Sequence, residues 1–217
     1  NRVRASGISH EVGHALGLSH DGVSGDNYYN GHAAGIGTWM TLMGTSVSGF
    51  SQWDRGSYIG SNNSQDDLAI ITNLTNGFGY RPDDHTNSAT TATPLVSIGG
   101  VASTQLGEGI VEQNTDFDLF SFSVTGGVFN FSADPAVRSP NLDVGLSLFD
   151  SAMNLIADGS LIDNLSASLN DIALAAGDYF VQITGTGNRT WADGYDDYGS
   201  LGKYFVRITE APVVVTF

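Results

Sequence analysis

The sequence predicts a short α+β region followed by an all-β sandwich domain, and three observations indicate this organisation. Four of the five histidines lie within residues 1–80. Residues 81–94 are rich in proline, aspartate, asparagine and threonine, which is typical of a linker. The rest of the chain consists of short alternating segments separated by turn residues, as in a β-sandwich. We therefore expect a first domain over 1–80, a linker and entry segment over 81–105, and a sandwich over 106–217.

Two helices are expected in the first region. One is predicted over residues 3–16 and ends at Gly17, which permits a positive φ angle. The other is predicted over residues 64–75, where aspartates in the first turn interact favourably with the helix dipole. Residues 22–60 are rich in glycine, serine, asparagine and tyrosine, and we expect long loops and turns there.

Six strands are expected in the second region, because apolar and polar residues alternate within each of them. The Thr-Gly-Gly sequence at 125–127 predicts a hairpin turn between the first two strands, and further turn signals separate the others. The predicted strands are 118–124, 128–133, 142–149, 165–174, 178–184 and 203–209.

The composition excludes several functional classes. The 217 residues include 23 acidic and 8 basic side chains, so the formal net charge is −15. This charge argues against binding of nucleic acid and against attraction to anionic lipid. No apolar run approaches the ~18–20 residues that cross a bilayer, so no membrane insertion is expected. The chain has no cysteine, which excludes disulfides and a thiol nucleophile.

A metal-binding pattern lies near the start of the chain. His10 and His14 are four residues apart, so on a helix both imidazoles lie on one face and can bind the same metal ion. Gly17 allows the chain to turn back after the helix, which brings His20 to that ion as a third ligand. Three neutral imidazoles and a water molecule form the open tetrahedral site of a catalytic zinc. Glu11 is displaced around the helix, where it is placed to accept a proton from the zinc-bound water.

The segment 10–21, HEVGHALGLSHD, resembles the zinc motif of the metzincin clan of endopeptidases. The aspartate after the third histidine, Asp21, makes it most similar to the adamalysin/reprolysin branch. The resemblance implies the lower subdomain of a metzincin catalytic domain. Such a subdomain contains the zinc helix, loops with a methionine turn beneath the metal, and a closing C-terminal helix, here at 64–75.

Met43 is the better candidate for the methionine of that turn, and Met40 is the alternative. In some metzincins a tyrosine two residues after the methionine also reaches the zinc, but Thr45 occupies this position. The resemblance therefore implies three protein ligands. It also implies that Asp21 forms a hydrogen bond within the turn beneath the site, the alternative being an ordinary turn aspartate.

The resemblance implies hydrolysis of an internal peptide bond in a protein or peptide substrate. Zinc would polarise the carbonyl group, and Glu11 would act as general base and then donate the proton to the leaving amine. The upper half of a metzincin catalytic domain has no counterpart before Asn1, so this segment alone is expected to be inactive. The alternative function is a surface binding or adhesion module with a vestigial metallopeptidase region.

Residues 106–210 resemble the bacterial pre-peptidase C-terminal domain. The resemblance rests on strand-and-turn motifs at 114–122, 141–150, 174–183 and 202–208. It implies an accessory domain of a secreted bacterial peptidase, of a kind that is often removed during maturation and that includes polymer-binding modules. We therefore expect a secreted, extracellular and monomeric protein from a bacterium.

Asp116, Asp118 and Asp143 are candidate calcium ligands, because calcium prefers hard oxygen ligands. No complete calcium-binding loop is present, so solvated acids at turns and strand ends are the favoured alternative. The loop 193–198, with its aspartates and tyrosines, is open to the same two interpretations.

Further histidines and tyrosines of the first region are less informative. His32 and His85 have no partner at helical spacing, so surface positions in loops are expected for both. Tyr28 and Tyr29 either line the cleft of the zinc site or pack in the interior.

Overall fold

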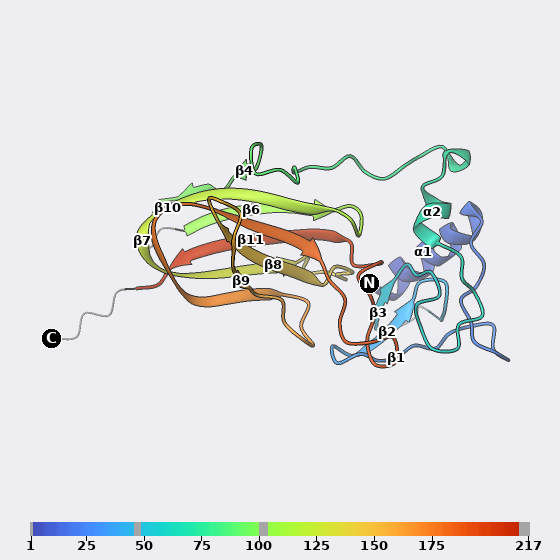
Figure 1. The fold of residues 1–217 in the computed structure, drawn as a ribbon. Coiled ribbons are helices and arrows are strands. Elements are labelled where there is room, and N and C mark those ends of the chain that lie inside the picture. Colours follow the sequence, from blue (N-terminus) through green and yellow to red (C-terminus); the bar gives the residue numbers. More distant parts are fainter. Residues whose placement is uncertain (1, 46–48, 100–103, 213–217) are drawn as a thin grey trace.

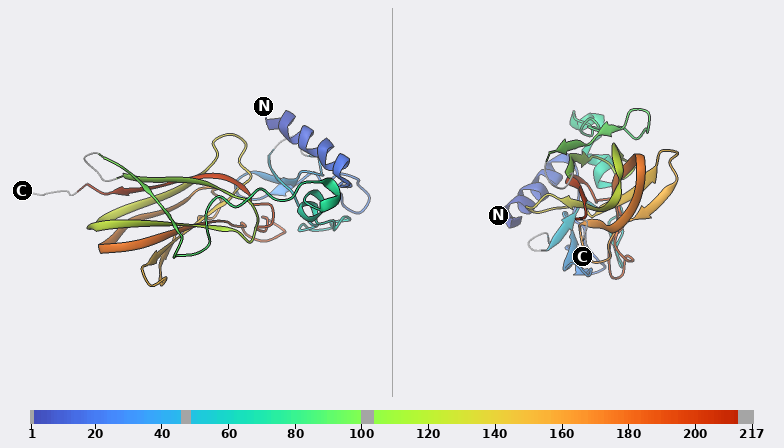
Figure 2. Two further views of the ribbon diagram at one scale, coloured as in Figure 1. Left: turned by 90° about the horizontal axis from the view of Figure 1, so that it is seen from above. Right: turned by 90° about the vertical axis from the view of Figure 1, so that its left-hand side faces the viewer.

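The computed structural model of the chain describes residues 2–45, 49–99 and 104–212, and it has two parts (Figure 1). An elongated β-sandwich holds most of the strands, and the helices lie beyond one end of it together with a small sheet. An extended segment, drawn in green, runs from the helices along the outside of the molecule to the sandwich. Figure 2 shows the same arrangement from two further directions.

The first part contains a three-stranded sheet of order β1-β2-β3 beside its helices. Its elements are α1 (Arg2–Leu16), β1 (His32–Ala33), β2 (Thr38–Thr41), β3 (Phe50–Gln52), α2 (Asp67–Ile71) and the 3-10 helix η1 (Leu74–Asn76). The sheet lies within residues 22–60, so the expectation of loops and turns alone in this segment is wrong. Strands this short lack the alternation by which a sequence identifies a strand.

The helix predicted over residues 64–75 is divided in the structure. α2 begins after Asp66, whose side chain accepts a hydrogen bond from the Ala69 backbone amide. The side chain of Asn73 accepts a hydrogen bond from the Asn76 amide and begins the separate helix η1. Asparagine side chains compete with helical backbone bonds, so this second cap ends the continuous helix.

Within the described residues, eight strands form the second part and confirm the all-β sandwich that the sequence predicts. They are β4 (Thr93–Pro94), β5 (Val96–Ile98), β6 (Thr104–Val111), β7 (Phe117–Pro135), β8 (Val144–Asp150), β9 (Leu155–Asp158), β10 (Ala167–Gly185) and β11 (Gly202–Glu210). The strand order is β5-β6-β11-β7-β10-β8-β9, with β4 paired to β7.

Two strands of 19 residues, β7 and β10, replace the hairpin predicted over 118–133 and the two separate strands predicted over 165–184. They pair with each other over nearly their full length. The first half of β7 also pairs with β4 and its second half with β11, so the strand passes from one layer of the sandwich to the other. Gly126 and Gly127, with φ angles of 96° and 150°, bend the strand where the hairpin turn is predicted.

The core of the sandwich is formed by inward-facing side chains of the long strands. The alternation is clear in β11, where Tyr204, Val206 and Ile208 are buried and the residues between them are exposed. This is the pattern of a strand with one face on the core. No helix of the described residues is long and apolar enough to span a membrane.

Candidate metal centres

The three predicted zinc ligands lie together at the end of α1. The ring centroids of His10 and His14 are 4.8 Å apart, and the His20 ring lies 5.3 Å from His10 and 4.6 Å from His14. One nitrogen from each ring lies within 4.8 Å of the other two, so a single metal ion could be held among them. Three imidazoles leave a fourth position open, as a catalytic zinc requires.

The end of α1 has the two hydrogen bonds of a Schellman motif. The Leu18 amide donates to the Gly13 carbonyl at 3.0 Å, and the Gly17 amide donates to the His14 carbonyl at 3.1 Å. Gly17 has a φ angle of 106°, which residues with a side chain rarely adopt. The motif turns the chain back along the helix and brings His20 beside the other two histidines.

Two carbonyl groups fix the protonation of the helix histidines. Nδ1 of His10 lies 2.8 Å from the Leu42 carbonyl oxygen, and Nδ1 of His14 lies 2.8 Å from that of Leu18. A carbonyl oxygen only accepts, so each Nδ1 carries a proton and each neutral ring presents an unprotonated Nε2. The two Nε2 atoms are 3.1 Å apart, which places two lone pairs against each other. A cation bound by both atoms relieves this repulsion, and zinc–nitrogen bonds of about 2.0–2.1 Å suit the spacing.

Glu11 is exposed beside the three histidines. The pKa of the His20 ring is lowered, first by burial and then by the charges of His14 and His10, and the Glu11 carboxylate opposes this shift. Glu11 therefore acts electrostatically on the histidine cluster while it remains open to solvent. The ring of Tyr28 lies 4.2 Å from that of His20 and is 41% exposed, so it forms an edge of the same site.

Met43 and Asp21 are buried, and Met43 lies against α1 at Gly13. A Cβ atom at Gly13 would be 2.6 Å from the Met43 sulfur, so α1 can approach this methionine only because residue 13 is glycine. The Asp21 amide donates to the Met43 carbonyl at 2.9 Å, and its Oδ1 accepts from the Asn63 side-chain amide at 3.0 Å. Burial raises the pKa of Asp21 to about 6. Met40, the alternative candidate, is buried on the neighbouring strand β2.

His32 and His85 are both half-buried; His85 lies in a loop as expected, whereas His32 lies in the short strand β1. Nε2 of His32 donates to the Gly194 carbonyl at 2.7 Å, because a carbonyl oxygen is only an acceptor. This bond connects the first part of the chain to the sandwich. Nε2 of His85 is similarly 2.8 Å from the Glu108 carbonyl oxygen. Tyr29 packs in the aromatic interior of the first part, unlike Tyr28.

A second group of possible ligands lies where the linker crosses the start of β7. Carboxylate oxygens of Asp83, Glu112 and Asp116 lie within 4.8 Å of one another, and so do those of Asp83, Asp84 and Asp118. The sequence identifies only Asp116 and Asp118, because the tertiary fold brings the other three acids beside them. The pair of adjacent aspartates in the linker is the one local signal that could have extended the set.

Two carboxyl groups of this cluster are buried with unpartnered oxygens. Glu112 is 7% exposed, and neither of its carboxylate oxygens accepts a hydrogen bond from the described residues. The Nε atom of Arg81 lies 3.9 Å from one of them. Oδ2 of Asp118 accepts from the Tyr204 hydroxyl at 2.5 Å, whereas its Oδ1 has no donor in the described part. Burial raises the pKa of Glu112 to about 7 and that of Asp118 to about 8, and neighbouring carboxylates add to both shifts.

Asp143 lies apart from this cluster. It accepts a hydrogen bond from the Tyr195 hydroxyl at 2.8 Å, and it belongs to none of the ligand groups found among the described residues. Burial raises its pKa to about 7. In the loop 193–198, Asp196 accepts from the Ser57 hydroxyl at 2.8 Å. These acids therefore have partners within the fold.

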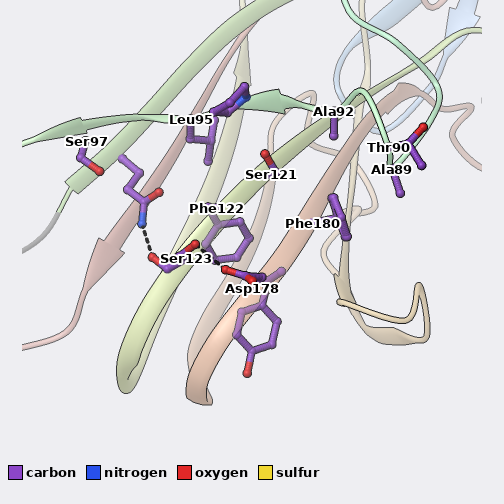
Figure 3. A pocket seen from close by; sticks show the side chains of 13 residues that line it. Ala89, Thr90, Ala92, Leu95, Ser97, Ser121, Phe122, Ser123, Asp178 and Phe180 are labelled. Atoms are coloured by element: carbon purple, nitrogen blue, oxygen red, sulfur yellow. Dashed lines mark hydrogen bonds between the residues drawn. The ribbon is translucent and has the colours of Figure 1, made fainter.

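A hollow of about 530 Å³ lies on the sandwich between the segment 89–97, β7 and β10 (Figure 3). In its wall the Gln105 side chain donates to the Ser123 carbonyl at 3.1 Å, and the Ser123 hydroxyl donates to Asp178 at 2.6 Å. None of the residues of either metal-ligand group lines this hollow.

No protein-family model matches the chain, and no curated protein matches its sequence. Among solved structures the chain is similar to the pre-peptidase C-terminal domain of a collagenase from Bacillus anthracis. The TM-score is 0.38 and the identity 14%, over 59% of this chain and 97% of that one. The chain is also similar to PliG, a periplasmic inhibitor of g-type lysozyme from Aeromonas hydrophila. Here the TM-score is 0.36 and the identity 10%, over 55% and 96% of the two chains. At these identities the likeness concerns the fold alone.

Proposed function

We propose that this chain is part of a secreted bacterial zinc endopeptidase of metzincin type, with an accessory sandwich of the pre-peptidase C-terminal type. One observation carries the proposal. The Nε2 atoms of His10 and His14 are 3.1 Å apart, while both Nδ1 atoms are hydrogen-bonded to carbonyl groups. His20 beside them completes an open three-nitrogen site. The burial of Asp21 and of Met43, which lies against α1 at Gly13, supports the metzincin resemblance.

A bound zinc ion would polarise the carbonyl group of the scissile peptide bond and lower the pKa of a water molecule toward neutrality. Glu11, whose carboxylate is exposed beside the candidate ligands, would accept the proton of that water and then donate it to the leaving amine. The carbonyl groups of Leu42 and Leu18 hold His10 and His14 in the tautomer that binds metal.

The zinc content of the purified chain is the first test of this proposal. We expect one zinc ion per chain, and loss of the metal in the His20→Ala variant, because only two imidazoles remain. The matched control is His85→Ala, since the His85 ring is hydrogen-bonded elsewhere in the fold. A wild-type chain that takes up no zinc from a stoichiometric solution contradicts the proposal.

The proposed reaction is tested by measuring hydrolysis of a protein substrate, with this segment in its natural full-length protein. Glu11→Gln keeps the size of the side chain but cannot accept the proton. We expect unchanged zinc content and a loss of activity of about 100-fold or more. Full activity in this variant would exclude Glu11 as the general base, and zinc binding without any hydrolysis would favour the vestigial binding module instead.

We also propose that the sandwich binds calcium through Asp83, Glu112 and Asp116, with Asp84 and Asp118, which form a second group around the same Asp83, as further ligands. Glu112 and Asp118 have buried oxygens that accept no hydrogen bond within the described residues, and this supports the site, because a buried carboxylate oxygen without a hydrogen-bond donor is costly. Calcium takes 6–8 oxygen ligands, about what these carboxylates and a few water molecules supply. Such an ion would fasten the linker to the sandwich.

Thermal unfolding with and without calcium tests this second site. An ion that binds only the folded chain raises the midpoint, and more so at higher concentration. Glu112→Gln removes both a ligand and a repelled buried charge, so its midpoint should rise without calcium and no longer respond to calcium. Asp171→Asn changes an exposed aspartate of β10 and should respond like the wild type. A wild-type response in Glu112→Gln would show that the ligand assignment is wrong.

A further inference from the structure

The loop between β10 and β11, residues 186–200, packs into the first part of the chain. Tyr195 lies at its centre and is 1% exposed. Its ring stacks on that of Trp39 with a centroid distance of 6.2 Å and an interplanar angle of 15°, and it lies 5.0 Å from the Phe50 ring. Together with Tyr58 these rings form one buried cluster, so the sandwich contributes a buried aromatic residue to the core of the first part.

Main-chain groups of the first part find their partners in this loop. The Leu68 amide donates to the Tyr198 hydroxyl at 2.7 Å, and the Ala34 carbonyl accepts from the Asn188 side-chain amide at 3.2 Å. Buried main-chain groups that lose such partners cost free energy. Removal of the sandwich would therefore leave both an apolar surface and polar groups without partners.

The loop also approaches β3 closely at Gly199. A Cβ atom at this position would be 2.5 Å from the Trp53 carbonyl oxygen and 2.6 Å from the Cβ atom of Gln52. Only a glycine permits this approach, because distances under 3.0 Å essentially never occur for a Cβ atom. The contact is thus built into the sequence of the loop.

A chain of hydrogen bonds runs from the sandwich to the first zinc ligand. Gln52 is 1% exposed, and its side-chain amide donates to the Asn141 carbonyl at 2.7 Å. The Gln52 carbonyl accepts from the Leu42 amide at 2.7 Å. The Leu42 carbonyl in turn accepts from Nδ1 of His10 at 2.8 Å. The position of the sandwich is therefore coupled to the orientation of the His10 ring.

We propose that the sandwich is a permanent support of the metal centre, held by the loop 186–200, and that it stays bound after the linker is cut. Gln52 and Tyr195 are then positioning residues that act on His10 through β3 and β2. The part of this inference that concerns the metal rests on the proposed zinc site. The association of the two parts does not depend on zinc, so the two claims can be tested separately.

Cleavage of the linker tests the association. A protease recognition sequence is inserted after Gly79, where residues 77–82 are exposed and lie outside helices and strands. After cleavage we expect the two pieces to elute together in gel filtration and to separate only in denaturant. Separation without denaturant overturns the proposal. Since this readout needs no metal, it remains informative if the wild-type chain binds no zinc, which would instead count against the proposed function.

The Gly199→Ala variant tests the effect of the loop on the metal centre. The control is Gly99→Ala, because a Cβ atom at Gly99 meets nothing within 4 Å. We expect the zinc affinity of Gly199→Ala, measured in competition with a chelator, to be lower by about tenfold or more. Loss of a group that orients a metal ligand typically has an effect of this size. The visible spectrum of the cobalt-loaded variant should change as well, and Gly99→Ala should match the wild type in both measurements.

Gln52→Glu provides a second variant in case Gly199→Ala does not fold. The glutamate can still accept from Nε1 of Trp39, which donates to Oε1 of Gln52 at 2.8 Å, but it cannot donate to the Asn141 carbonyl. With an unchanged circular dichroism spectrum, we expect the same loss of zinc affinity. Wild-type affinity and an unchanged cobalt spectrum in the folded variants overturn the coupling to the metal centre.

Discussion

At Gly13 the helix that carries the histidines is in direct contact with the methionine beneath it. A Cβ atom at this position would be 2.6 Å from the Met43 sulfur and 3.3 Å from a methyl carbon of Leu18. A Cβ atom at Gly7, in the same helix, would meet nothing within 4 Å. Alanine forms helices better than glycine at both positions. A substitution at Gly7 therefore measures helix propensity alone, whereas the same substitution at Gly13 also measures the contact with Met43.

Gly13→Ala is expected to lower the free energy of unfolding by about 1–3 kcal/mol, because Met43 must move to make room. Gly7→Ala is expected to raise it by about 0.5–1 kcal/mol. Urea unfolding followed by circular dichroism measures both values. A gain of similar size in both variants would contradict the contact between the helix and Met43.

The candidate metal ligands differ in how far the sequence can identify them. His10, His14 and the turn at Gly17 are local features, so their spacing predicts that the imidazoles meet. Asp83 and Glu112 belong to different segments and meet only through the tertiary fold, so no local spacing predicts them. The sequence does not distinguish an aspartate that joins a ligand cluster from an ordinary aspartate at a turn or strand end. The calcium candidates predicted from the sequence therefore include Asp116 and Asp118, which belong to the cluster, and Asp143, which does not.

The pair β7 and β10 shows which elements local patterns can predict. Alternation identifies most of the strands because burial of one face is repeated every second residue. The Gly-Gly pair at 126–127 predicts a hairpin, and positive φ angles are indeed present there. Whether the chain reverses or only bends depends on the strand that lies opposite, and that strand is β10. The sequence of β7 alone cannot supply this information.

Gly126→Ala tests the bend. The φ angle of 96° disfavours any residue with a side chain, so we expect a loss of about 1–2 kcal/mol in the free energy of unfolding. Gly177→Ala is the matched control, because Gly177 lies opposite Val124 beside the same bend and its contacts begin at 3.7 Å. It should be neutral or slightly stabilising. Thermal unfolding measures both variants, and equal losses would contradict a special backbone role for Gly126.

The contact between the two parts is a property of the whole molecule. The loop 186–200 has the composition of an exposed loop, and Tyr195 is buried only because Trp39 and Phe50 lie opposite it. The net charge of −15 similarly suggests solvated acids, whereas Asp67 and Asp143 lie in the interior. Long-range packing decides both features, so composition does not predict them.

Asp67, at the start of α2, is fully buried, and its Oδ1 has no donor among the described residues. Burial, and then the charges of Asp21, Asp54 and Asp66, raise its pKa to about 8. The folded chain therefore keeps a proton on this carboxyl group at a pH where the unfolded chain, with a pKa of about 3.9, has released it. Because the folded state binds more protons in this interval, the stability falls as the pH rises through it.

Asp67→Asn should remove this dependence, since the amide has the same shape and does not ionise. We expect the free energy of unfolding of the wild type to fall between about pH 5 and about pH 8, and that of the variant to fall less steeply, by up to about 1.4 kcal/mol per pH unit. Both proteins are measured at the same concentrations of zinc and calcium, so that the contribution of metal binding to the slope cancels in the comparison. Asp171→Asn changes an exposed aspartate and should keep the wild-type slope. A wild-type slope in Asp67→Asn, with a uniform loss of stability at every pH, would mean that Asp67 is ionised in the folded chain throughout.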